Sequence, residues 1–533
     1  MDDFSPPPAS FPAAPPRGMQ RTIAVGGGRP GVGQSTLCLN LAVYLAQLGR
    51  TVVIVDSDPS GACLHNMLGM EFPEPEKNPD PLQSEELNPL PTPVPGLSLL
   101  PQLYSRETTV PLRPGRRPRW AKGLRHLNCD YVILDLGAGT GPTTLDLFHD
   151  ADLGICMTAP DPPSVEASYR FLRALFARRL RKSLLKDRFR MRQLERALES
   201  LPALPSPLKV IEAVSRFDAA TARSAHELLT SLRPCLVTSK TRLRQDTELA
   251  SLMASLSSRY LGIQVDSLGH IEHDDAIWLS VIRKIPLLID NPTSKGARNL
   301  ERIARRVVAL AGTREASGLP ASDQRTDNER SLYDILWTHR GAGDEELRRA
   351  SKRQRELFQE ESLPLTSLLP PLELARERGR IEEAQETLLD PVRRRTYDIS
   401  FFPDATAQLD DLPPEQDEAR LAEQALLRQA LLHEIHPQTE YTGDLLGRIR
   451  ESLGIEIEEI SKKTKISGSH LRAIEEEDFE NLPAEVYTRG FLRQIAALLQ
   501  IDPTQATRSY IRRLRDLKQK AQEASSSTTR REP

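Results

Sequence analysis

A glycine-rich stretch near the first residues carries the residue types and the spacing of a phosphate-binding loop. Residues 22–36 read Thr-Ile-Ala-Val-Gly-Gly-Gly-Arg-Pro-Gly-Val-Gly-Gln-Ser-Thr, and an apolar-periodic segment follows to residue 48. This pattern predicts a strand, a loop and a helix, in which backbone N–H groups and the helix N-terminus bind phosphate. In such loops a lysine neutralises the phosphates and a hydroxyl holds Mg²⁺, but the lysine position here is Gln34. The sequence therefore predicts a phosphate cradle that lacks its mobile positive charge.

Other apolar runs end in carboxylates. Asp56 and Asp58 follow one run and Asp135 follows the next. These runs are residues 51–55, 131–134, 153–158 and 235–238. Near-continuous apolar runs separated by helical segments predict a doubly wound α/β domain with a buried parallel sheet. Ligands bind at the carboxyl ends of strands in such sheets, so we expect these carboxylates to lie beside the loop.

Length and composition restrict the class of protein. The 533 residues suggest about three domains. The net charge of −3 is too small to indicate, by itself, that the protein binds nucleic acid or a membrane. The cysteines are scattered without metal-ligand spacing, which favours free thiols in the cytosol; they are Cys38, Cys63, Cys129, Cys156 and Cys235. No segment resembles a signal peptide or a membrane span. We expect a cytoplasmic, multidomain protein.

Shifts in composition divide the chain into modules and linkers. We predict a disordered Pro-rich tail (1–20), an α/β P-loop domain (21–313) with a Pro-rich surface insertion (73–119), a polar linker (314–329), a helical module (330–403), an acidic and helical linker (404–440), a helix-turn-helix domain (441–519) and a disordered tail (520–533). The fold class is thus an α/β parallel-sheet domain followed by two all-α modules.

Three motifs of the first domain resemble those of MinD/ParA-type ATPases. Residues 29–36 resemble the deviant Walker A sequence KGGVGKT, and residues 53–61 resemble the second motif of that family. Residues 131–140 resemble its Walker B in the version seen in MinD and the flagellar-number regulator FlhG, and the whole resemblance covers about residues 21–312. It implies binding of ATP or ADP with Mg²⁺ and a homodimer formed through this domain.

The same resemblance assigns roles to individual residues. It implies Mg²⁺ held by Ser35 and Asp135, and an attacking water oriented by Asp56 and Asp58; otherwise these two aspartates simply cap the strand end. The nucleotide-binding residues that it implies are Gly28, Arg29, Gly31, Val32, Gly33, Gln34, Ser35 and Thr36.

Departures from the family pattern leave three alternatives for this site. The Walker lysine is Gln34, the signature lysine is Arg29, and the first of the paired glycines is Pro30, which removes one backbone donor. Phosphoryl transfer depends on positioning and charge stabilisation, so the loss of lysine should damage turnover more than binding. The site is then a degenerate one that hydrolyses weakly or not at all, a working ATPase in which Arg29 reaches phosphates across the dimer, or a purely structural loop.

Residues 170–192 form a strongly basic segment with ten lysines and arginines and one acid. Apolar residues recur at helical spacing, so we predict a basic amphipathic helix or helix pair. It is either a solvated helix face, or a surface attracted to DNA phosphates, to anionic lipid or to an acidic segment of the same chain.

The next module, residues 330–403, resembles a J-domain. The resemblance rests on LYDIL, DEELRRA and EEAQETLLDPVRRRTYD, with helices expected at 344–358 and 372–389. The His-Pro-Asp tripeptide that stimulates DnaK-type chaperones should follow the first helix, where the sequence is Gln359-Glu-Glu-Ser-Leu-Pro-Leu. We therefore expect a helical docking module without co-chaperone activity.

Three short segments with Gly-containing turns near the other end predict a helix-turn-helix. They span 443–454, 456–464 and 469–477. The stretch to residue 495 resembles the cytoplasmic helix-turn-helix of RodZ, in which aromatics at the positions of Phe491 and Ile495 bind an actin-like filament.

DNA is the alternative partner of this domain. Ser469, His470 and Arg472 begin the candidate recognition helix and could meet base edges, whereas the four acids at 475–478 would repel phosphates. Arginines of the following helix, Arg512 and Arg513 among them, form a compensating basic patch. Protein binding, DNA binding and a structural cap remain open.

Taken together, the modules favour a cytoplasmic regulatory or spatial-organisation protein, with the P-loop domain as a dimerising or docking platform. A DNA-binding transcription or segregation factor, and an active positioning ATPase that uses Arg29, are the alternatives.

Overall fold

The computed structural model describes residues 20–58, 63–71, 87–101, 120–313, 330–359, 362–402, 439–478, 482–483, 485–499 and 501–528. These residues belong to two compact units, Pro16–Ala419 and Arg420–Pro533 with Met1–Pro15. The predicted tail before residue 20, the linker 314–329 and the acidic stretch 403–438 lie outside the described residues.

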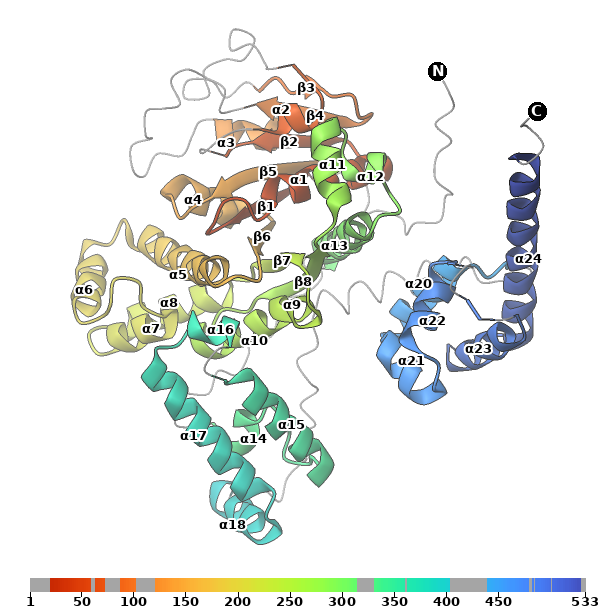
Figure 1. Ribbon diagram of the computed structural model, residues 1–533. Coiled ribbons are helices and arrows are strands. Elements are labelled where there is room, and N and C mark those ends of the chain that lie inside the picture. Colours follow the sequence, from red (N-terminus) through yellow and green to blue (C-terminus); the bar gives the residue numbers. More distant parts are fainter. Residues whose placement is uncertain are drawn as a thin grey trace. The chain divides into compact units, whose positions relative to one another are not determined.

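An eight-stranded sheet forms the centre of the first unit, in the order β3-β4-β2-β5-β1-β6-β7-β8 (Figure 1). Its strands are β1 (Arg21–Gly27), β2 (Val52–Asp56), β3 (Leu90–Pro91), β4 (Leu97–Pro101), β5 (Tyr131–Ala138), β6 (Leu153–Thr158), β7 (Cys235–Thr241) and β8 (Asp266–Glu272). All neighbouring strands pair in parallel except β3, which is antiparallel to β4. The predicted doubly wound α/β domain is confirmed.

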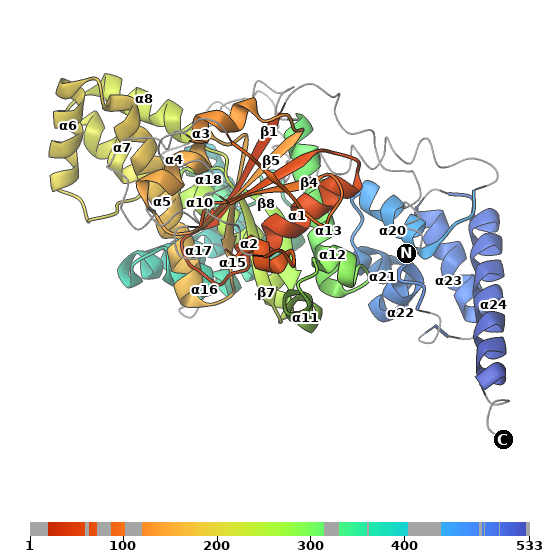
Figure 2. The ribbon, with the colours of Figure 1, turned by 90° about the horizontal axis from the view of Figure 1, so that it is seen from above.

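Helices cover both faces of the sheet (Figure 2), which explains the continuous apolar runs of the central strands. One face carries α1 (Gln34–Gln47), α12 (Leu287–Asp290) and α13 (Lys295–Thr313), and the other carries α4 (Pro142–Asp150), α5 (Pro162–Leu184) and α10 (Leu249–Leu261). The remaining helices of the domain are α2 (Leu64–Met67), α3 (Trp120–Gly123), α6 (Arg188–Glu199), α7 (Pro207–Ser215), α8 (Ala219–Thr230), α9 (Arg244–Thr247) and α11 (Asp275–Arg283), with a 3₁₀ turn at Leu124–His126.

The interval 73–119 is not only a surface insertion, contrary to the prediction. Its described part supplies β3 and β4, and β4 pairs with β2 from Val52–Leu97 to Asp56–Pro101. The prolines of this interval flank the short run Leu97–Leu100 instead of interrupting it, so they bound a strand rather than exclude one.

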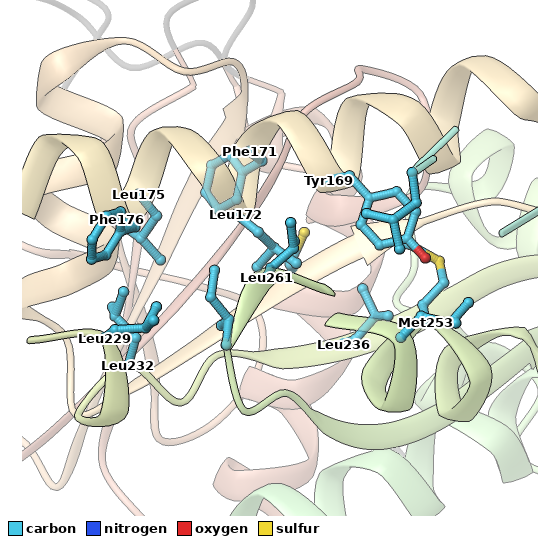
Figure 3. Packing of buried hydrophobic residues seen from close by; sticks show 14 of the residues in the cluster. Tyr169, Phe171, Leu172, Leu175, Phe176, Leu229, Leu232, Leu236, Met253 and Leu261 are labelled. Carbon is cyan, nitrogen blue, oxygen red and sulfur yellow. The ribbon is translucent and has the colours of Figure 1, made fainter. Parts of the chain in front are cut away.

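The basic segment is a helix pair, α5 and α6, as predicted. Asp187 caps α6 by accepting hydrogen bonds from the N–H groups of Phe189 and Arg190, which separates the two helices. The apolar side chains of α5 pack against residues from α8, the turn after α8, β7 and α10 (Figure 3). The labelled residues are Tyr169, Phe171, Leu172, Leu175, Phe176, Leu229, Leu232, Leu236, Met253 and Leu261. Its basic face is partly neutralised, because Arg178 and Lys182 form ion pairs with Asp146 at 2.6 and 3.4 Å.

The helical module shares a continuous hydrophobic core with the P-loop domain. It contains α14 (Leu332–Ile335), α15 (Asp344–Leu357), α16 (Leu363–Thr366), α17 (Pro371–Leu388) and α18 (Pro391–Phe401). The short helix α16 was not predicted; it lies between the two long helices and contacts α5 and α10. Leu365, Leu368 and Leu369 are buried there, and Arg173 of α5 donates a hydrogen bond to the Leu368 carbonyl.

A buried ion pair joins the same two parts. Glu377 of α17 accepts hydrogen bonds from Arg259 at 3.1 Å and from the Tyr260 hydroxyl at 2.9 Å, both residues of α10. The side chains of Arg259 and Glu377 are only 7% and 10% exposed. A buried carboxylate without its cation is strongly destabilising, so this contact fixes the position of α17 on the P-loop domain.

The second unit is a helical domain built around one apolar cluster. Its helices are α20 (Gly443–Ser452), α21 (Ile457–Thr464), α22 (Gly468–Glu475), α23 (Glu485–Leu498) and α24 (Pro503–Thr528). The three predicted short helices are therefore present. The last helix runs into the predicted disordered tail, since Lys, Gln, Ala and Glu in residues 518–524 are strong helix formers. None of the described helices is both long and apolar enough to cross a bilayer.

Replacing Glu377 by alanine should loosen the helical module from the P-loop domain. Removing one member of a buried ion pair leaves the other charge unpaired, at a cost of about 3–5 kcal/mol of unfolding free energy. Hydrogen exchange of α16 and α17 is the measurement. The control is Glu373→Ala, because Glu373 is 45% exposed and its ion pair with Lys209 should contribute less than about 1 kcal/mol. Equal exchange in the two variants would contradict the role of Glu377.

Candidate nucleotide-binding site

The loop between β1 and α1 has the geometry that the sequence predicts for a phosphate cradle. Gly31 and Gly33 have φ angles of 78° and 91°, and a Cβ atom on either would meet almost nothing within 4 Å. Glycine is therefore required by the backbone and not by crowding. Helix α1 begins at Gln34, so its N-terminal N–H groups lie where the loop ends.

The opposite constraint applies at Gly28, where a Cβ atom would lie 2.0 Å from the Ala167 carbonyl oxygen of α5. The loop thus rests directly on α5. Arg29 also faces this helix, with its guanidinium 3.5 Å from Asp161, the residue whose carboxylate caps α5 by accepting from the Ser164 N–H. Arg29 is 43% exposed and is held at the surface by this contact.

Gln34 occupies the position of the missing lysine and is 5% exposed. A Cβ atom on Gly27 would lie 3.0 Å from Nε2 of Gln34 and 2.8 Å from the Met157 carbonyl oxygen. Within the described part of the chain Nε2 has no hydrogen-bond partner. The amide therefore fills the floor of the loop as an unsatisfied donor without charge.

Three carboxylates gather beside Ser35, as predicted from the strand ends. Asp135 accepts from the Gly137 N–H at 3.2 Å, and Asp56 accepts from the Leu64 N–H at 2.8 Å. Asp58 lies against the left-handed Gly137, where a Cβ atom would come within 2.2 Å of its carboxyl group. The other oxygen of Asp135, Oδ2, is buried and accepts no hydrogen bond from any described residue.

Burial raises the pKa of Asp135, and the negative charges of Asp56 and Asp58 add to the shift, while the Ser35 hydroxyl and the Gly137 N–H oppose it; the resulting pKa is about 7. A buried carboxylate with an unsatisfied oxygen, next to a serine hydroxyl, is the donor set that a hard divalent cation takes. Ser35 and Asp135 therefore lie next to each other, and their binding of Mg²⁺ stays a prediction.

Sequence reasoning missed the contribution of β7. The Ser239 hydroxyl donates to the Val32 carbonyl at 2.6 Å, and Lys240 Nζ donates to the Gly31 carbonyl at 2.6 Å. The signal was present, because the apolar run 235–237 ends in the polar residues Thr238-Ser239-Lys240. It is the same pattern that identified Asp56 and Asp135.

These observations fit a bound nucleotide phosphate with Mg²⁺. The loop glycines leave open space, Gln34 and Asp135 present buried polar atoms without partners, and Ser35 and Thr36 begin a helix. The residues fit a phosphate and a metal ion better than they fit a purely structural loop, which would leave these buried polar groups unsatisfied.

Of the residues predicted to bind a partner in the second unit, some lie on α22 and one lies in the hydrophobic core. Ser469, His470 and Arg472 lie on α22, and the His470 ring is 5.7 Å from that of Phe491 on α23. Ile495 is only 5% exposed and belongs to the core, so its predicted contact with a partner is wrong for this conformation.

The predicted basic patch is largely neutralised. Arg512 pairs with Glu440, and Arg513 pairs with Glu477 at 3.0 Å. Arg515 pairs with Glu485 at 2.7 Å.

Comparison with known proteins agrees with this geometry. A ParA family profile described as NUBPL iron-transfer P-loop NTPase matches residues 18–175, and a helix-turn-helix domain profile matches residues 445–506. The chain contains a ParA-type P-loop NTPase domain and a helix-turn-helix domain.

Individual relatives match the ParA-type domain. The chromosome-partitioning ATPase Soj of Thermus thermophilus is 34% identical over 136 residues, 26% of this chain and 53% of Soj. The iron-sulfur cluster carrier protein of Bacillus subtilis is 33% identical over 132 residues, 24% of this chain and 35% of that protein. The antiactivator FleN of Pseudomonas aeruginosa is 26% identical over 157 residues, 29% of this chain and 56% of FleN. The chain thus spans about half or less of the length of these relatives.

Among solved structures, MinD of Pyrococcus horikoshii complexed with Mg-ADP is similar, at 20% identity and a TM-score of 0.37. The match covers 56% of this chain and 100% of that one.

The raised pKa of Asp135 predicts a pH dependence of stability in EDTA without nucleotide. The folded state holds the proton more tightly than the unfolded chain, so stability should be greatest at low pH and fall as the pH rises from about 4 to about 7. Asp135→Asn removes the buried charge and should raise Tm at pH 8 by on the order of a few degrees.

Thermal unfolding across this pH range checks the prediction. The control Asp152→Asn removes a surface carboxylate that accepts from the Thr22 N–H, and it should keep the wild-type slope. A wild-type Tm that does not fall between these pH values, or an Asp135→Asn variant with the same slope, would contradict the prediction.

Proposed function

We propose that this chain is a cytoplasmic regulatory or spatial-organisation protein. Its ParA-type domain binds ATP or ADP with Mg²⁺, hydrolyses it weakly or not at all, and serves as a dimerising or docking platform. The helical module and the helix-turn-helix domain recruit protein partners. The presence of a ParA-type domain and a helix-turn-helix domain in one chain supports this combination.

The observation that carries the proposal is the replacement of the P-loop lysine by Gln34 within an otherwise well-formed site. The left-handed glycines, the helix N-terminus and the pairing of Ser35 with Asp135 all favour binding. Catalysis needs more, because charge builds up on the transferred phosphoryl group and must be stabilised. A neutral amide supplies roughly half the strength of a charge-assisted hydrogen bond. Binding should therefore survive while turnover is lost.

The roles proposed for the other residues follow from their positions. The N–H groups of the loop and of the first turn of α1 bind the phosphates, and Ser35 and Asp135 hold Mg²⁺ when it is bound. Mg²⁺ held by these two residues would neutralise phosphate charge. Asp56 and Asp58, beside Asp135, orient water at the terminal phosphate if any hydrolysis occurs.

An exposed apolar face supports the docking role. Helix α11 and the turn after it expose large apolar side chains, with Trp278 at 64% and Ile282 at 55%. Leu279, Val281 and Ile285 extend the same region. Contiguous exposed apolar residues are typical of protein interaction sites. We propose that a second copy of the chain covers this face in a homodimer of the P-loop domain.

For the helix-turn-helix domain we propose a protein partner rather than DNA. Arg512 and Arg513 are engaged by acids, and the exposed aromatic Tyr487 at 65% lies on α23, the helix that carries Phe491. Amphipathic aromatics are enriched at protein interfaces, whereas DNA binding depends on unpaired cations at phosphates.

Restoring the lysine tests the central claim. The full-length wild-type chain should bind MgATP with turnover close to background, and Gln34→Lys should raise turnover by roughly tenfold or more, because one charged donor contributes about 1.5–3 kcal/mol. Phosphate release measured beside ATP binding checks this. The matched control is Gln47→Lys, which adds the same charge at the exposed end of α1. Wild-type turnover typical of ParA-type ATPases would overturn the proposal and favour the alternative in which Arg29 acts.

Binding of the full-length chain to random duplex DNA tests the choice of partner. We expect weak binding with a shallow dependence on salt, because Arg512, Arg513 and Arg515 already form ion pairs with acids. Fluorescence anisotropy over a salt series is the measurement. A steep fall would support the DNA-binding alternative: for several phosphate contacts, the slope of log K against log salt would be about −0.9 for each contact. Loss of this slope in Arg472→Ala would support it too.

A further inference from the structure

Large apolar side chains are exposed to solvent where α5 is followed by α6. Leu185, just after α5, and Phe189, in the first turn of α6, are each 65% exposed, and Phe217, just after α7, is 52% exposed. The Nε atom of Arg190 lies 3.9 Å from the Asp218 carboxylate, so the turn that carries Phe217 lies beside the first turn of α6. The three side chains therefore belong to one apolar tip of the P-loop domain, made of Leu185, Phe189 and Phe217.

The packing of these helices does not need the apolar tip. Helix α6 contacts α5 and α7, and the buried side chains of this region are others, among them Leu184, Leu194 and Ala197. Figures 1 and 2 both show α6 at the edge of the domain, away from the central sheet. Single exposed apolar residues are ordinary on a protein surface, whereas a group of large ones is typical of a contact site. The apolar tip therefore indicates an external partner.

Cations surround the apolar tip. Residues 181–196 contain seven lysines and arginines and two acids, and residues three or four apart on a helix are neighbours on its surface. Lys182 and Arg190 are engaged by Asp146 and Asp187. The other five cations are exposed, and none of them forms an ion pair with another residue that the structure describes; they are Arg181, Lys186, Arg188, Arg192 and Arg196. The surface is thus apolar at its centre and strongly basic around it.

An anionic lipid surface matches both properties. Its headgroup phosphates attract lysine and arginine, and its interface accepts large apolar side chains to a depth of about 5–10 Å. Duplex DNA also offers phosphates, but it has no apolar layer along its backbone and would leave Leu185 and Phe189 in water. The combination of charge and exposed apolar side chains therefore favours lipid over DNA.

We propose that the apolar tip and the cations around it bind the surface of an anionic phospholipid membrane. Leu185, Phe189 and Phe217 enter the interface, and the five unpaired cations lie at the level of the phosphates. The attachment is peripheral, because the helices around the tip lie on the bilayer and do not cross it. This surface goes beyond the proposed function, and it requires no nucleotide.

Flotation of the full-length chain with lipid vesicles tests the inference. Vesicles of phosphatidylglycerol and phosphatidylcholine in equal parts supply the anionic surface, and phosphatidylcholine alone supplies the neutral one. We expect the wild-type chain to bind the anionic vesicles roughly tenfold or more tightly than the neutral ones, because each cation near such a surface contributes a factor of about five. Phe189→Ser should weaken this binding roughly tenfold or more, since it removes a large apolar side chain from the interface. The double variant Arg188→Gln, Arg192→Gln should weaken it to a similar extent by removing two cations.

The variant Phe189→Trp reports where this side chain goes. On anionic vesicles its fluorescence, after subtraction of the wild-type spectrum, should move to shorter wavelength, because the indole leaves water for the interface. On duplex DNA we expect no such shift.

Two matched controls remove the same kinds of side chain elsewhere. Leu372→Ser removes an apolar residue that is 84% exposed on α17, and the double variant Arg348→Gln, Arg353→Gln removes two exposed cations of α15. Both should bind anionic vesicles as the wild type does. A wild-type chain that does not float with anionic vesicles, or a control that weakens binding as much as its matched variant, would overturn the inference. Nucleotide binding, which tests the proposed function, is measured separately, so either can fail without the other.

Discussion

The structure around the P-loop depends on how one buried group of negative charges is balanced. Asp135 lies in the middle of the sheet with Asp56 and Asp58 close by, and its pKa is raised to about 7 because solvent is excluded and like charges are near. In a P-loop with lysine, the cation at position 34 would oppose this repulsion. Here the balance must come from the Ser35 hydroxyl, from backbone N–H groups and from whatever binds. The site therefore has an excess of negative charge, which a bound metal ion with its phosphate would balance.

Much of the P-loop domain could be predicted because its signals are local. The glycines that need positive φ, the apolar runs of buried strands and the carboxylates at strand ends all lie within a few residues of one another. β8 contains only two large apolar residues, Leu268 and Ile271, and β4 is flanked by prolines, so neither resembled the other strands. Ser239 and Lys240 follow an apolar run as the aspartates do, but the run does not show what they bind, because their partners in the loop are some 200 residues away.

In the helical module too, local features could be predicted from the sequence and contacts between distant segments could not. Its long helices α15 and α17 were predicted within one or two residues, since their apolar periodicity is intrinsic. The short helix α16 and the burial of Glu377 against Arg259 and Tyr260 depend on a surface that only the folded P-loop domain provides. For the same reason Ile495, which the sequence placed at an interface, lies in the core of the helix-turn-helix domain.

Helix α5 touches both the loop and the helical module. Near its N-terminus Asp161 contacts Arg29 and the Ala167 carbonyl lies against Gly28, and further along Arg173 donates a hydrogen bond to the Leu368 carbonyl, just after α16. A hydrogen-bonded helix of 23 residues is stiff and moves as one body. A shift of the loop on phosphate binding would thus move α5, and with it the contact of Arg173 with the Leu368 carbonyl, more than a full helical turn away. The phosphate loop and the helical module are thus attached to different turns of one helix.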